Sequence, residues 1–233
     1  MNKLLSIKNL SKVYYNKKEE TEAIKDISFD LYEGEFVSIV GPSGCGKSTL
    51  LNILTNMDTL TKGKIELKDN LKLGYMLQSD SMLSWRKVID NALLGLEIKK
   101  EKTKENINYV KNLFKKYGLS EFMEKHPFEL SGGMRQRVAL IRTLALKPDI
   151  LILDEPFSKL DYQSRLKVSD DVYKIIKNEG KTALMVTHDL AEAISISDRV
   201  IVLSERPCEI KNIYKIKREK EGTPIENRKD KNF

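Results

Sequence analysis

Hydrophobic and polar residues alternate in two stretches near the start of the chain, residues 4–10 and 24–31. Alternation with a period of two puts one face of a strand in a core and the other in solvent, so both stretches are predicted as half-buried β-strands. The charged residues 16–22 between them predict a turn. We expect these strands to form an antiparallel β subdomain at the N-terminus.

Further along, the pattern changes to short runs that are apolar almost throughout. Runs of this kind alternate with helical patterns, beginning with a helix over 48–57, which is typical of a parallel sheet covered by helices on both faces. The predicted strands span residues 35–40, 63–67, 73–77, 150–153, 182–187 and 199–203. The fold class is therefore predicted as α/β with a mainly parallel sheet.

A helical pattern interrupts this alternation from about residue 87 to 147. The apolar positions Ile107, Val110, Leu113, Phe114 and Tyr117 recur at helical spacing, and the first part of the segment contains no strand pattern. We interpret 87–147 as an α-helical subdomain inserted into the core. Residues 1–210 are expected to form a single domain, followed by a basic C-terminal tail over 211–233.

Size and composition are those of a soluble globular protein, with 233 residues, 40% of them hydrophobic and 32% charged. No apolar run approaches the roughly 18 residues that a membrane-spanning helix needs. The first residues lack the apolar segment of a signal peptide, so we expect no export. Any role at a membrane would therefore come through a partner.

The net charge of +7 is concentrated at the C-terminus, where residues 211–233 hold eight Lys or Arg against four Asp or Glu. Contact with nucleic acid or anionic lipid is one interpretation. A solvated, partly disordered end is the interpretation that we favour. Because no nucleic-acid-reading motif accompanies the charge, we expect no nucleic-acid partner.

A glycine-rich segment between a predicted strand and a predicted helix fits the pattern G-x-x-x-x-G-K-[ST]. It consists of Gly41, Pro42, Ser43, Gly44, Cys45, Gly46, Lys47, Ser48 and Thr49. Successive backbone N–H groups of such a loop face one concavity that binds phosphate oxygens. We expect Lys47 to bridge the β- and γ-phosphates of a nucleotide and the Ser48 hydroxyl to ligate Mg²⁺.

The two cysteines are too few for a disulfide framework and indicate a reducing compartment. Cys45 lies within the phosphate-binding loop, where N–H groups and a lysine favour the thiolate. We expect Cys45 to react with alkylating reagents, with ATP as a protectant. Cys208 is predicted to be an ordinary surface or semi-buried thiol.

A second glycine motif occurs about ninety residues later, in Leu130-Ser131-Gly132-Gly133-Met134-Arg135-Gln136-Arg137. Ser131 is a good helix N-cap, and Gly132 and Gly133 leave backbone N–H groups uncovered, which makes a second anion site. This run resembles the signature sequence of ATP-binding-cassette (ABC) proteins. The resemblance implies a P-loop NTPase core, ATP as ligand, and a homodimer in which the signature of one chain closes on ATP held by the other.

The apolar strand pattern of residues 150–153 ends in Asp154 and Glu155, 23 residues after Ser131, which is the spacing of the family. The resemblance implies that Asp154 holds Mg²⁺ and that Glu155 orients and polarises the attacking water. The chemistry implied is hydrolysis of ATP to ADP and phosphate.

Four further positions match the family. Gln78 follows the strand over 73–77 and resembles the glutamine that senses Mg²⁺ and water, and His188 resembles the histidine that contacts the γ-phosphate. Asp161 belongs to a loop that crosses the dimer interface in the family. Tyr14, with Tyr15 as the alternative, resembles the aromatic residue that stacks on adenine; a strand-edge tyrosine is the competing interpretation.

The segment 76–88, which includes Trp85, is similar to the nitrate, sulfonate and taurine importer branch of the family. The branch implies a separate transmembrane permease, an extracytoplasmic solute-binding protein that acts indirectly, and a peripheral location on the cytoplasmic face of the cell membrane. In the family, a groove beside this segment receives a short helix of the permease. Packing of Trp85 in the core of the helical subdomain is the alternative to such a contact.

Two functions other than transport are possible for a chain with these motifs. A soluble ABC ATPase that acts on nucleic acid or the ribosome is the first, but such proteins often have two cassettes or long coiled-coil insertions. A phosphotransferase is the second, and it would need an acceptor pocket and a lid that the sequence does not indicate.

Overall fold

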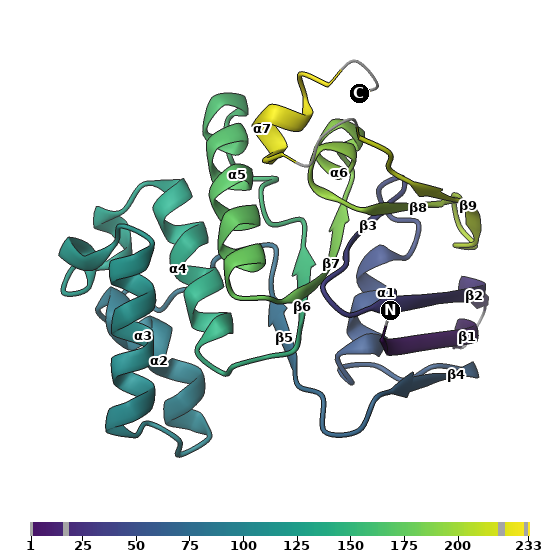
Figure 1. Ribbon diagram of the computed structural model, residues 1–233. Helices are drawn as coiled ribbons and strands as arrows, with labels where there is room; N and C mark the ends of the chain where they lie inside the picture. The colour runs from purple at the N-terminus through teal and green to yellow at the C-terminus, as the bar shows by residue number, and fades with distance from the viewer. Residues whose placement is uncertain (1, 16–18, 219–221, 231–232) are drawn as a thin grey trace.

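The computed structural model describes residues 2–15, 19–218, 222–230 and 233. Two β-sheets and a group of helices make up this part of the chain (Figure 1). The larger sheet has, in spatial order, strands β5 (Leu73–Met76), β6 (Ile150–Asp154), β7 (Thr182–Thr187), β3 (Phe36–Val40), β8 (Arg199–Leu203) and β9 (Ile210–Lys215). Its neighbours are parallel except β8 and β9, so the predicted mainly parallel α/β core is confirmed.

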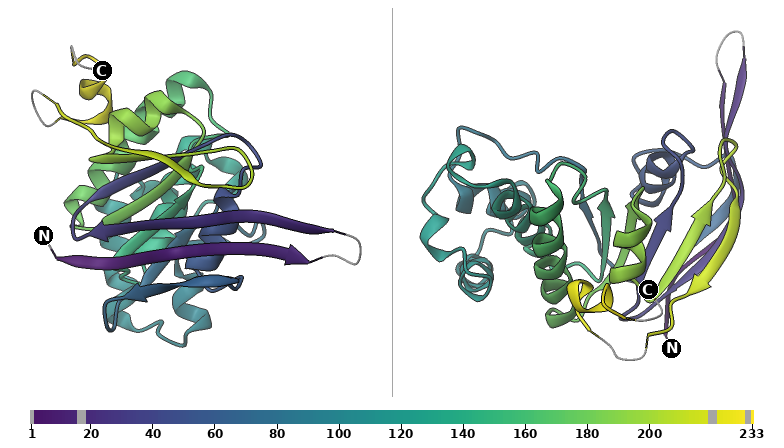
Figure 2. Two further views of the ribbon diagram at one scale, coloured as in Figure 1. Left: turned by 90° about the vertical axis from the view of Figure 1, so that its right-hand side faces the viewer. Right: turned by 90° about the horizontal axis from the view of Figure 1, so that it is seen from above.

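The smaller sheet is antiparallel, as predicted for the N-terminal subdomain. It contains, in spatial order, β2 (Glu20–Tyr32), β1 (Lys3–Tyr15) and β4 (Lys62–Leu67). Pairing of Tyr15 with Glu20 extends the hairpin into the region 16–22 that was predicted as a turn, and residues 16–18 lie outside the described residues. The backbone ladder forms whatever the charge of the side chains, and the hairpin projects beyond the rest of the molecule (Figure 2).

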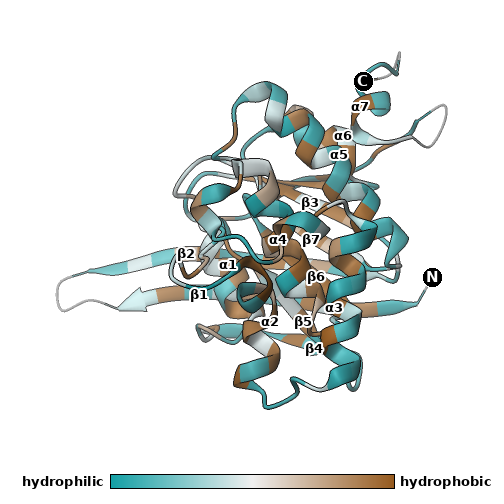
Figure 3. Cartoon of the chain, turned by 90° about the vertical axis from the view of Figure 1, so that its left-hand side faces the viewer, coloured by the Kyte–Doolittle hydropathy of each residue, from teal (hydrophilic) through white to brown (hydrophobic). Residues whose placement is uncertain are grey.

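Two hydrophobic cores lie on opposite faces of the six-stranded sheet. Alternation along β6 sends Leu151 and Leu153 to one face, and Ile150 and Ile152 to the other. The second face packs against α1 (Lys47–Leu54), which lies between the two sheets. In Figure 3, β6 and β7 are mainly brown where they run between the helices, as expected for strands that are buried on both faces.

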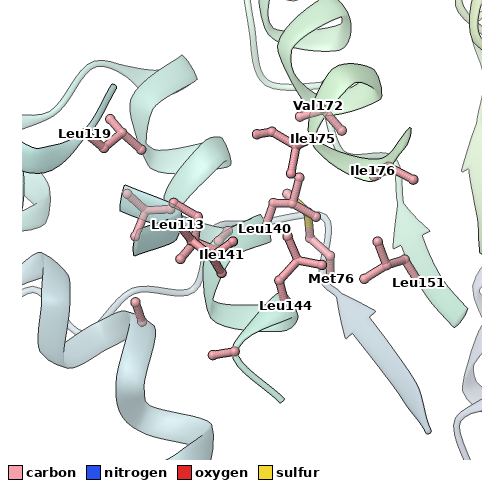
Figure 4. Packing of buried hydrophobic residues seen from close by; sticks show 14 of the residues in the cluster. Met76, Leu113, Leu119, Leu140, Ile141, Leu144, Leu151, Val172, Ile175 and Ile176 are labelled. Carbon is pink, nitrogen blue, oxygen red and sulfur yellow. The ribbon is translucent and has the colours of Figure 1, made fainter. Parts of the chain in front are cut away.

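The first face of the sheet packs against α5 (Tyr162–Asn178) and α4 (Gly132–Leu144), and through α4 against a helical subdomain (Figure 4). This subdomain adds α2 (Val88–Ile98), α3 (Lys104–Lys116) and two short 3₁₀ turns, Ser120–Phe122 and Pro127–Glu129. Residues 87–147, all of them described, contain no strand. Helix α4 therefore connects the inserted helices to the sheet.

The C-terminal segment differs from the solvated tail that was predicted. Strand β9 pairs with β8 along most of its length, and α7 (Pro224–Asn227) packs against α5 and α6 (Leu190–Ile196). The buried Asn227 side chain donates to the carbonyl of Ser195 at 2.6 Å. The prediction is wrong for these residues, because backbone pairing and one buried amide fix a segment whose composition is strongly basic. None of the helices in the described residues is long and apolar enough to cross a bilayer.

Candidate nucleotide site

The glycine-rich loop lies between the end of β3 and the start of α1. Gly44 has φ = 75° and Gly46 has φ = 131°, a region that residues with a Cβ atom rarely adopt. A Cβ atom on Gly46 would also lie 2.9 Å from the carbonyl oxygen of Ala23. The loop borders a cavity of about 300 Å³, whose lining consists of Ser43, Gly44, Gly46, Lys47, Ser48, Thr49, Gln78, Glu155 and Arg206.

The ammonium group of Lys47 lies within this loop. Its Nζ atom donates to the carbonyl oxygens of Gly41 and Pro42, both at 2.8 Å, and the side chain is only 6% exposed. These neutral carbonyls can be exchanged for phosphate oxygens, because a hydrogen bond to a charged acceptor is the stronger one. The position of Lys47 therefore suits a phosphate ligand.

Asp154 and Glu155 follow β6 at the same edge of the sheet. The Asp154 carboxylate accepts a hydrogen bond from the Tyr75 hydroxyl at 3.1 Å. Burial is the largest effect on the pKa of Asp154 and raises it, while the Tyr75 hydrogen bond and the charge of Lys47 act in the opposite direction. Asp154 is thus a partly buried carboxylate close to a cation.

Glu155 has an unusual backbone conformation, with φ = 41°. A residue with a Cβ atom rarely occupies this left-handed region, and it persists only where neighbours hold it. Here the N–H group of Glu155 donates to the carbonyl of Val186 at 2.9 Å, and Ser158 returns a side-chain hydrogen bond to the carbonyl of Glu155 at 3.0 Å. The strain places the carboxylate at the cavity.

Three side chains from three neighbouring strand ends meet at the Glu155 carboxylate. Its Oε2 atom lies 3.2 Å from Nε2 of Gln78, which follows β5, and 3.2 Å from Nδ1 of His188, which follows β7. The carboxyl ends of parallel strands share one edge, and sites form there. Residues that are far apart in the sequence are thereby brought to one point beside the phosphate-binding loop.

The residues expected to hold Mg²⁺ provide the ligands that this ion prefers. Ser48 contributes a hydroxyl, Asp154 a carboxylate and Gln78 an amide oxygen, all of them hard oxygen donors. Ser48 and Gln78 both line the cavity, and Asp154 adjoins Glu155. Three or more His, Cys, Asp or Glu residues do not cluster into a metal site in the described residues, so such an ion would depend on water and phosphate oxygens for its other ligands.

The signature segment forms the start of α4 and does not line this cavity. Ser131 caps the helix by accepting a hydrogen bond from the N–H of Met134 at 3.3 Å. A Cβ atom on Gly133 would lie 2.5 Å from Cγ2 of Val168, so α4 can approach α5 this closely only with glycine there. The glycine therefore has a packing role in addition to exposing the backbone.

Asp161 also has a local structural role, because it caps α5 by accepting from the N–H of Ser164 at 3.0 Å. The preceding Leu160 lies against the signature, where a Cβ atom on Gly132 would be 3.0 Å from its Cδ2 atom. Neither Asp161 nor Ser131 touches the cavity of its own chain.

Tyr14 and Tyr15 are both solvent-accessible, 38% and 66% exposed, and neither lines the cavity. The Tyr14 hydroxyl donates to Asp58 at 2.7 Å, and Nζ of Lys12 lies 4.7 Å from the centre of its ring. Hydrogen bonds from Lys12 and Tyr14 lower the pKa of Asp58 to about 2. Tyr14 is the tyrosine that the structure holds in place, and Tyr15 remains the alternative.

Trp85 is 74% exposed, so of the two alternatives for this residue, packing in the subdomain core is wrong. The loop before it is tied to the signature helix. Arg135 Nε donates to the Asp80 carboxylate at 2.9 Å, and Arg142 donates to the carbonyls of Asp80 and Ser81 at 2.6 and 3.0 Å. The glutamine loop and the start of α4 are thus joined by side chains.

The structure places two residues at the site that were not predicted there from the sequence. Cys208 is fully buried, so the prediction of a surface or semi-buried thiol is wrong. A hydrogen bond between the two thiols lowers the pKa of Cys45, and the charge of Lys47 lowers it further. Arg206 borders the phosphate cavity. Both belong to the turn after β8, and only the sheet order, which places β8 beside β3, brings this turn to the loop.

Comparison with known proteins decides the family. The ABC transporter family matches residues 24–158, more than half of the 233 residues. The chain belongs to the ABC transporter family. An uncharacterized ABC transporter ATP-binding protein of Bacillus subtilis, YtlC, is 41% identical to this ABC protein over 98% of the chain and 91% of the relative.

Two further similarities are informative. The taurine import ATP-binding protein TauB of Jannaschia sp. is 39% identical over 90% of this chain and 81% of its own length. A bacterial ABC transporter cassette solved as a dimer aligns with a TM-score of 0.77 and 32% identity, covering 92% of this chain and 99% of the cassette. This ABC protein is an ATP-binding and ATP-hydrolysing subunit of a transporter.

Proposed function

We propose that two copies of this ABC ATPase close around ATP, with the phosphate-binding loop of one copy facing the signature of the other. The observation that carries the proposal is the separation of the two motifs within one chain. Lys47 and Glu155 line the cavity, whereas Ser131, Gly132 and Gly133 do not, although Ser131 and its helix start remain accessible. Each chain therefore carries the phosphate-binding loop on one surface and the complementary signature on another.

The proposed reaction is attack of water on the γ-phosphate, with each group in a defined role. Lys47 binds phosphate oxygens, and Glu155 accepts a hydrogen bond from the water and polarises it. Gln78 and His188, each 3.2 Å from Glu155, orient its carboxylate and contact the water and the γ-phosphate. Ser48, Asp154 and Gln78 would hold Mg²⁺, which neutralises phosphate charge when bound.

Substitution of Glu155 by Gln tests this assignment. The amide keeps the shape of the side chain but loses the charge that polarises water, so we expect ATP affinity within about twofold and turnover reduced by about a hundredfold or more. Because hydrolysis no longer separates the subunits, ATP should trap a dimer, measured by size-exclusion chromatography with light scattering. Addition of Ser131→Arg to this variant is the control, since it should abolish the dimer.

Wild-type turnover of Glu155→Gln would remove Glu155 from the catalytic role. A strictly monomeric ATP-loaded Glu155→Gln protein, even with its permease present, would overturn the sandwich itself.

We further propose that the partner is a transmembrane permease that imports a small solute such as a sulfonate, taurine or nitrate. Support comes from the resemblance of residues 76–88 to that importer branch and from the taurine import relative. The protein would then act at the cytoplasmic face of the membrane, and a solute-binding protein outside the cell would act on it only through the permease. The exposed Trp85 and the ties from Asp80 to α4 suit a contact that transmits motion.

Trp85→Ala tests the permease contact, with Ile98→Ala as a matched control because Ile98 is an apolar side chain of similar exposure, 73% against 74%. We expect Trp85→Ala to weaken co-purification with a co-expressed permease partner about tenfold, and Ile98→Ala to leave it unchanged. Equal retention of both variants would contradict the contact. Uptake of radiolabelled taurine or nitrate by the reconstituted complex identifies the solute.

A further inference from the structure

The turn between β8 and β9, residues 204–209, lies against the phosphate-binding loop and is itself held firmly. Within the turn, the Ser204 hydroxyl donates to the carbonyl of Pro207 at 2.9 Å and accepts from the N–H of Glu209 at 2.8 Å. The backbone of Cys208 exchanges two hydrogen bonds with β2, through Ala23 and Lys25, at 3.0 and 2.9 Å. The turn is therefore fixed at its base, with Arg206 at its tip.

Arg206 reaches from this turn to the phosphate cavity. Its Nη2 atom donates to the carbonyl oxygen of Gly44 at 2.9 Å, and its side chain lines the cavity together with Lys47. Lys47 is nearly buried and donates to two carbonyl oxygens of the loop, whereas Arg206 is exposed and donates to one carbonyl oxygen of the same loop. Among the lining residues, Lys47 and Arg206 are the cations and Glu155 is the carboxylate, so without Arg206 the lining would carry no net charge.

We propose that Arg206 is a second phosphate-binding cation of the nucleotide site, acting beside Lys47. A guanidinium group has five N–H donors in a fixed plane, and within the described residues Arg206 uses one of them, in the hydrogen bond to Gly44. The remaining donors can bind phosphate oxygens without giving up that contact, in the two-pronged geometry that arginine favours with phosphate. The inference rests on the proposed placement of the nucleotide in this cavity.

Three substitutions separate charge from hydrogen bonding. Arg206→Lys keeps the charge, Arg206→Gln keeps a donor for Gly44 but removes the charge, and Arg206→Ala removes both. Lys25→Ala is the matched control, because Lys25 forms an ion pair with Glu209 of the same turn at 3.0 Å but does not line the cavity. Dissociation constants for ATP and ADP are measured by isothermal titration calorimetry on the full chain, with unfolding midpoints recorded for every variant.

We expect the Kd of ADP and of ATP to rise about tenfold in Arg206→Ala and Arg206→Gln, and about threefold in Arg206→Lys, with Lys25→Ala unchanged. The difference between Arg206→Gln and the unmodified protein should shrink when salt is raised from about 50 mM to 500 mM, because screening weakens a surface charge.

Unchanged affinity in Arg206→Gln would overturn the proposal, as would equal affinities of the Gln and Lys variants, which would show that only the hydrogen bond to Gly44 matters. Failure of the nucleotide placement has a different signature: Lys47→Ala would then bind ADP as well as the unmodified protein does.

Discussion

The edge of the sheet that holds Glu155 and the start of helix α4 that holds Ser131 use their polar groups in opposite ways. At the sheet edge, Gln78, Glu155 and His188 come from three strand ends, and Gln78 and His188 each lie 3.2 Å from the Glu155 carboxylate beside the cavity. At the helix start, Ser131 caps its own helix, and Gly132 and Gly133 pack against Leu160 and Val168 of the same chain. The first region lies at a cavity of its own chain, and the second is accessible at the surface.

This contrast separates the groups that one chain supplies to its own cavity from the groups that it presents to another surface. The sheet edge and the adjacent loop place the ammonium of Lys47 and the carboxylate of Glu155 at one cavity, and His188 lies 3.2 Å from Glu155. In the proposed function, this region binds and positions the phosphates. In the proposed sandwich, the signature contributes the N–H groups of a helix start to an anion that the other copy holds. A substitution in one region should therefore leave the other region intact. The two kinds of substitution should differ in whether they change ATP affinity or turnover.

The largest expected effects come from one substitution in each region. Lys47→Ala removes the buried ammonium from the loop and should raise the Kd of ATP about a hundredfold.

Gly133→Ala places a Cβ atom 2.5 Å from Val168 and pushes the start of α4 away. It should leave the Kd of ATP within about twofold but reduce turnover about a hundredfold, because the second anion site is displaced.

Calorimetry and phosphate-release assays on both variants test this pair. Loss of ATP affinity in Gly133→Ala, with an unchanged unfolding midpoint, would contradict the separation of the two regions.

A smaller effect concerns the helix that follows His188. Glu192 in α6 is 3% exposed, and burial raises the pKa of its carboxyl to about 7. The folded protein therefore binds a proton that the unfolded chain releases above its ordinary pKa, so the free energy of unfolding should fall as pH rises from about 4.5 to 7, by about 3 kcal/mol.

Glu192→Gln cannot lose a proton and should remove this part of the pH dependence. Urea unfolding of both proteins at pH 5 and pH 8 measures it; parallel pH profiles for the two proteins would show that the carboxyl does not titrate as expected.

The smallest effect concerns the connection between the two regions. Asp80→Asn weakens the ion pair between Asp80 and Arg135, whose charged atoms lie 2.9 Å apart. The two side chains are 28% and 35% exposed. We expect turnover to fall about threefold with unchanged ATP affinity, because the glutamine loop and α4 move less tightly together. Lys87→Ala, which breaks an exposed pair with Glu124, is the control for loss of a surface ion pair. Equal turnover in the two variants would argue against coupling through Asp80.

Much of the fold followed from local patterns. The apolar run that became β6 and the helix that follows Lys47 were visible because a strand buried on both faces and a glycine-to-helix transition leave local signals. The predicted turn over 16–22 was too long, because the polar residues 20–22 extend the second strand of the hairpin by backbone pairing with residues 13–15. The C-terminal strand β9 was missed because its side chains are mostly exposed and only its pairing with β8 defines it.

For the site, local spacing along the chain is enough to identify the residue types at the strand ends and in the two glycine motifs. The folded arrangement is needed to see that Gln78 and His188 meet at Glu155, that Trp85 is exposed, and that Cys208 and Arg206 lie against the phosphate-binding loop. The physical reason is sheet order: parallel strands distant in sequence become neighbours only when the sheet forms, and their ends then share one edge.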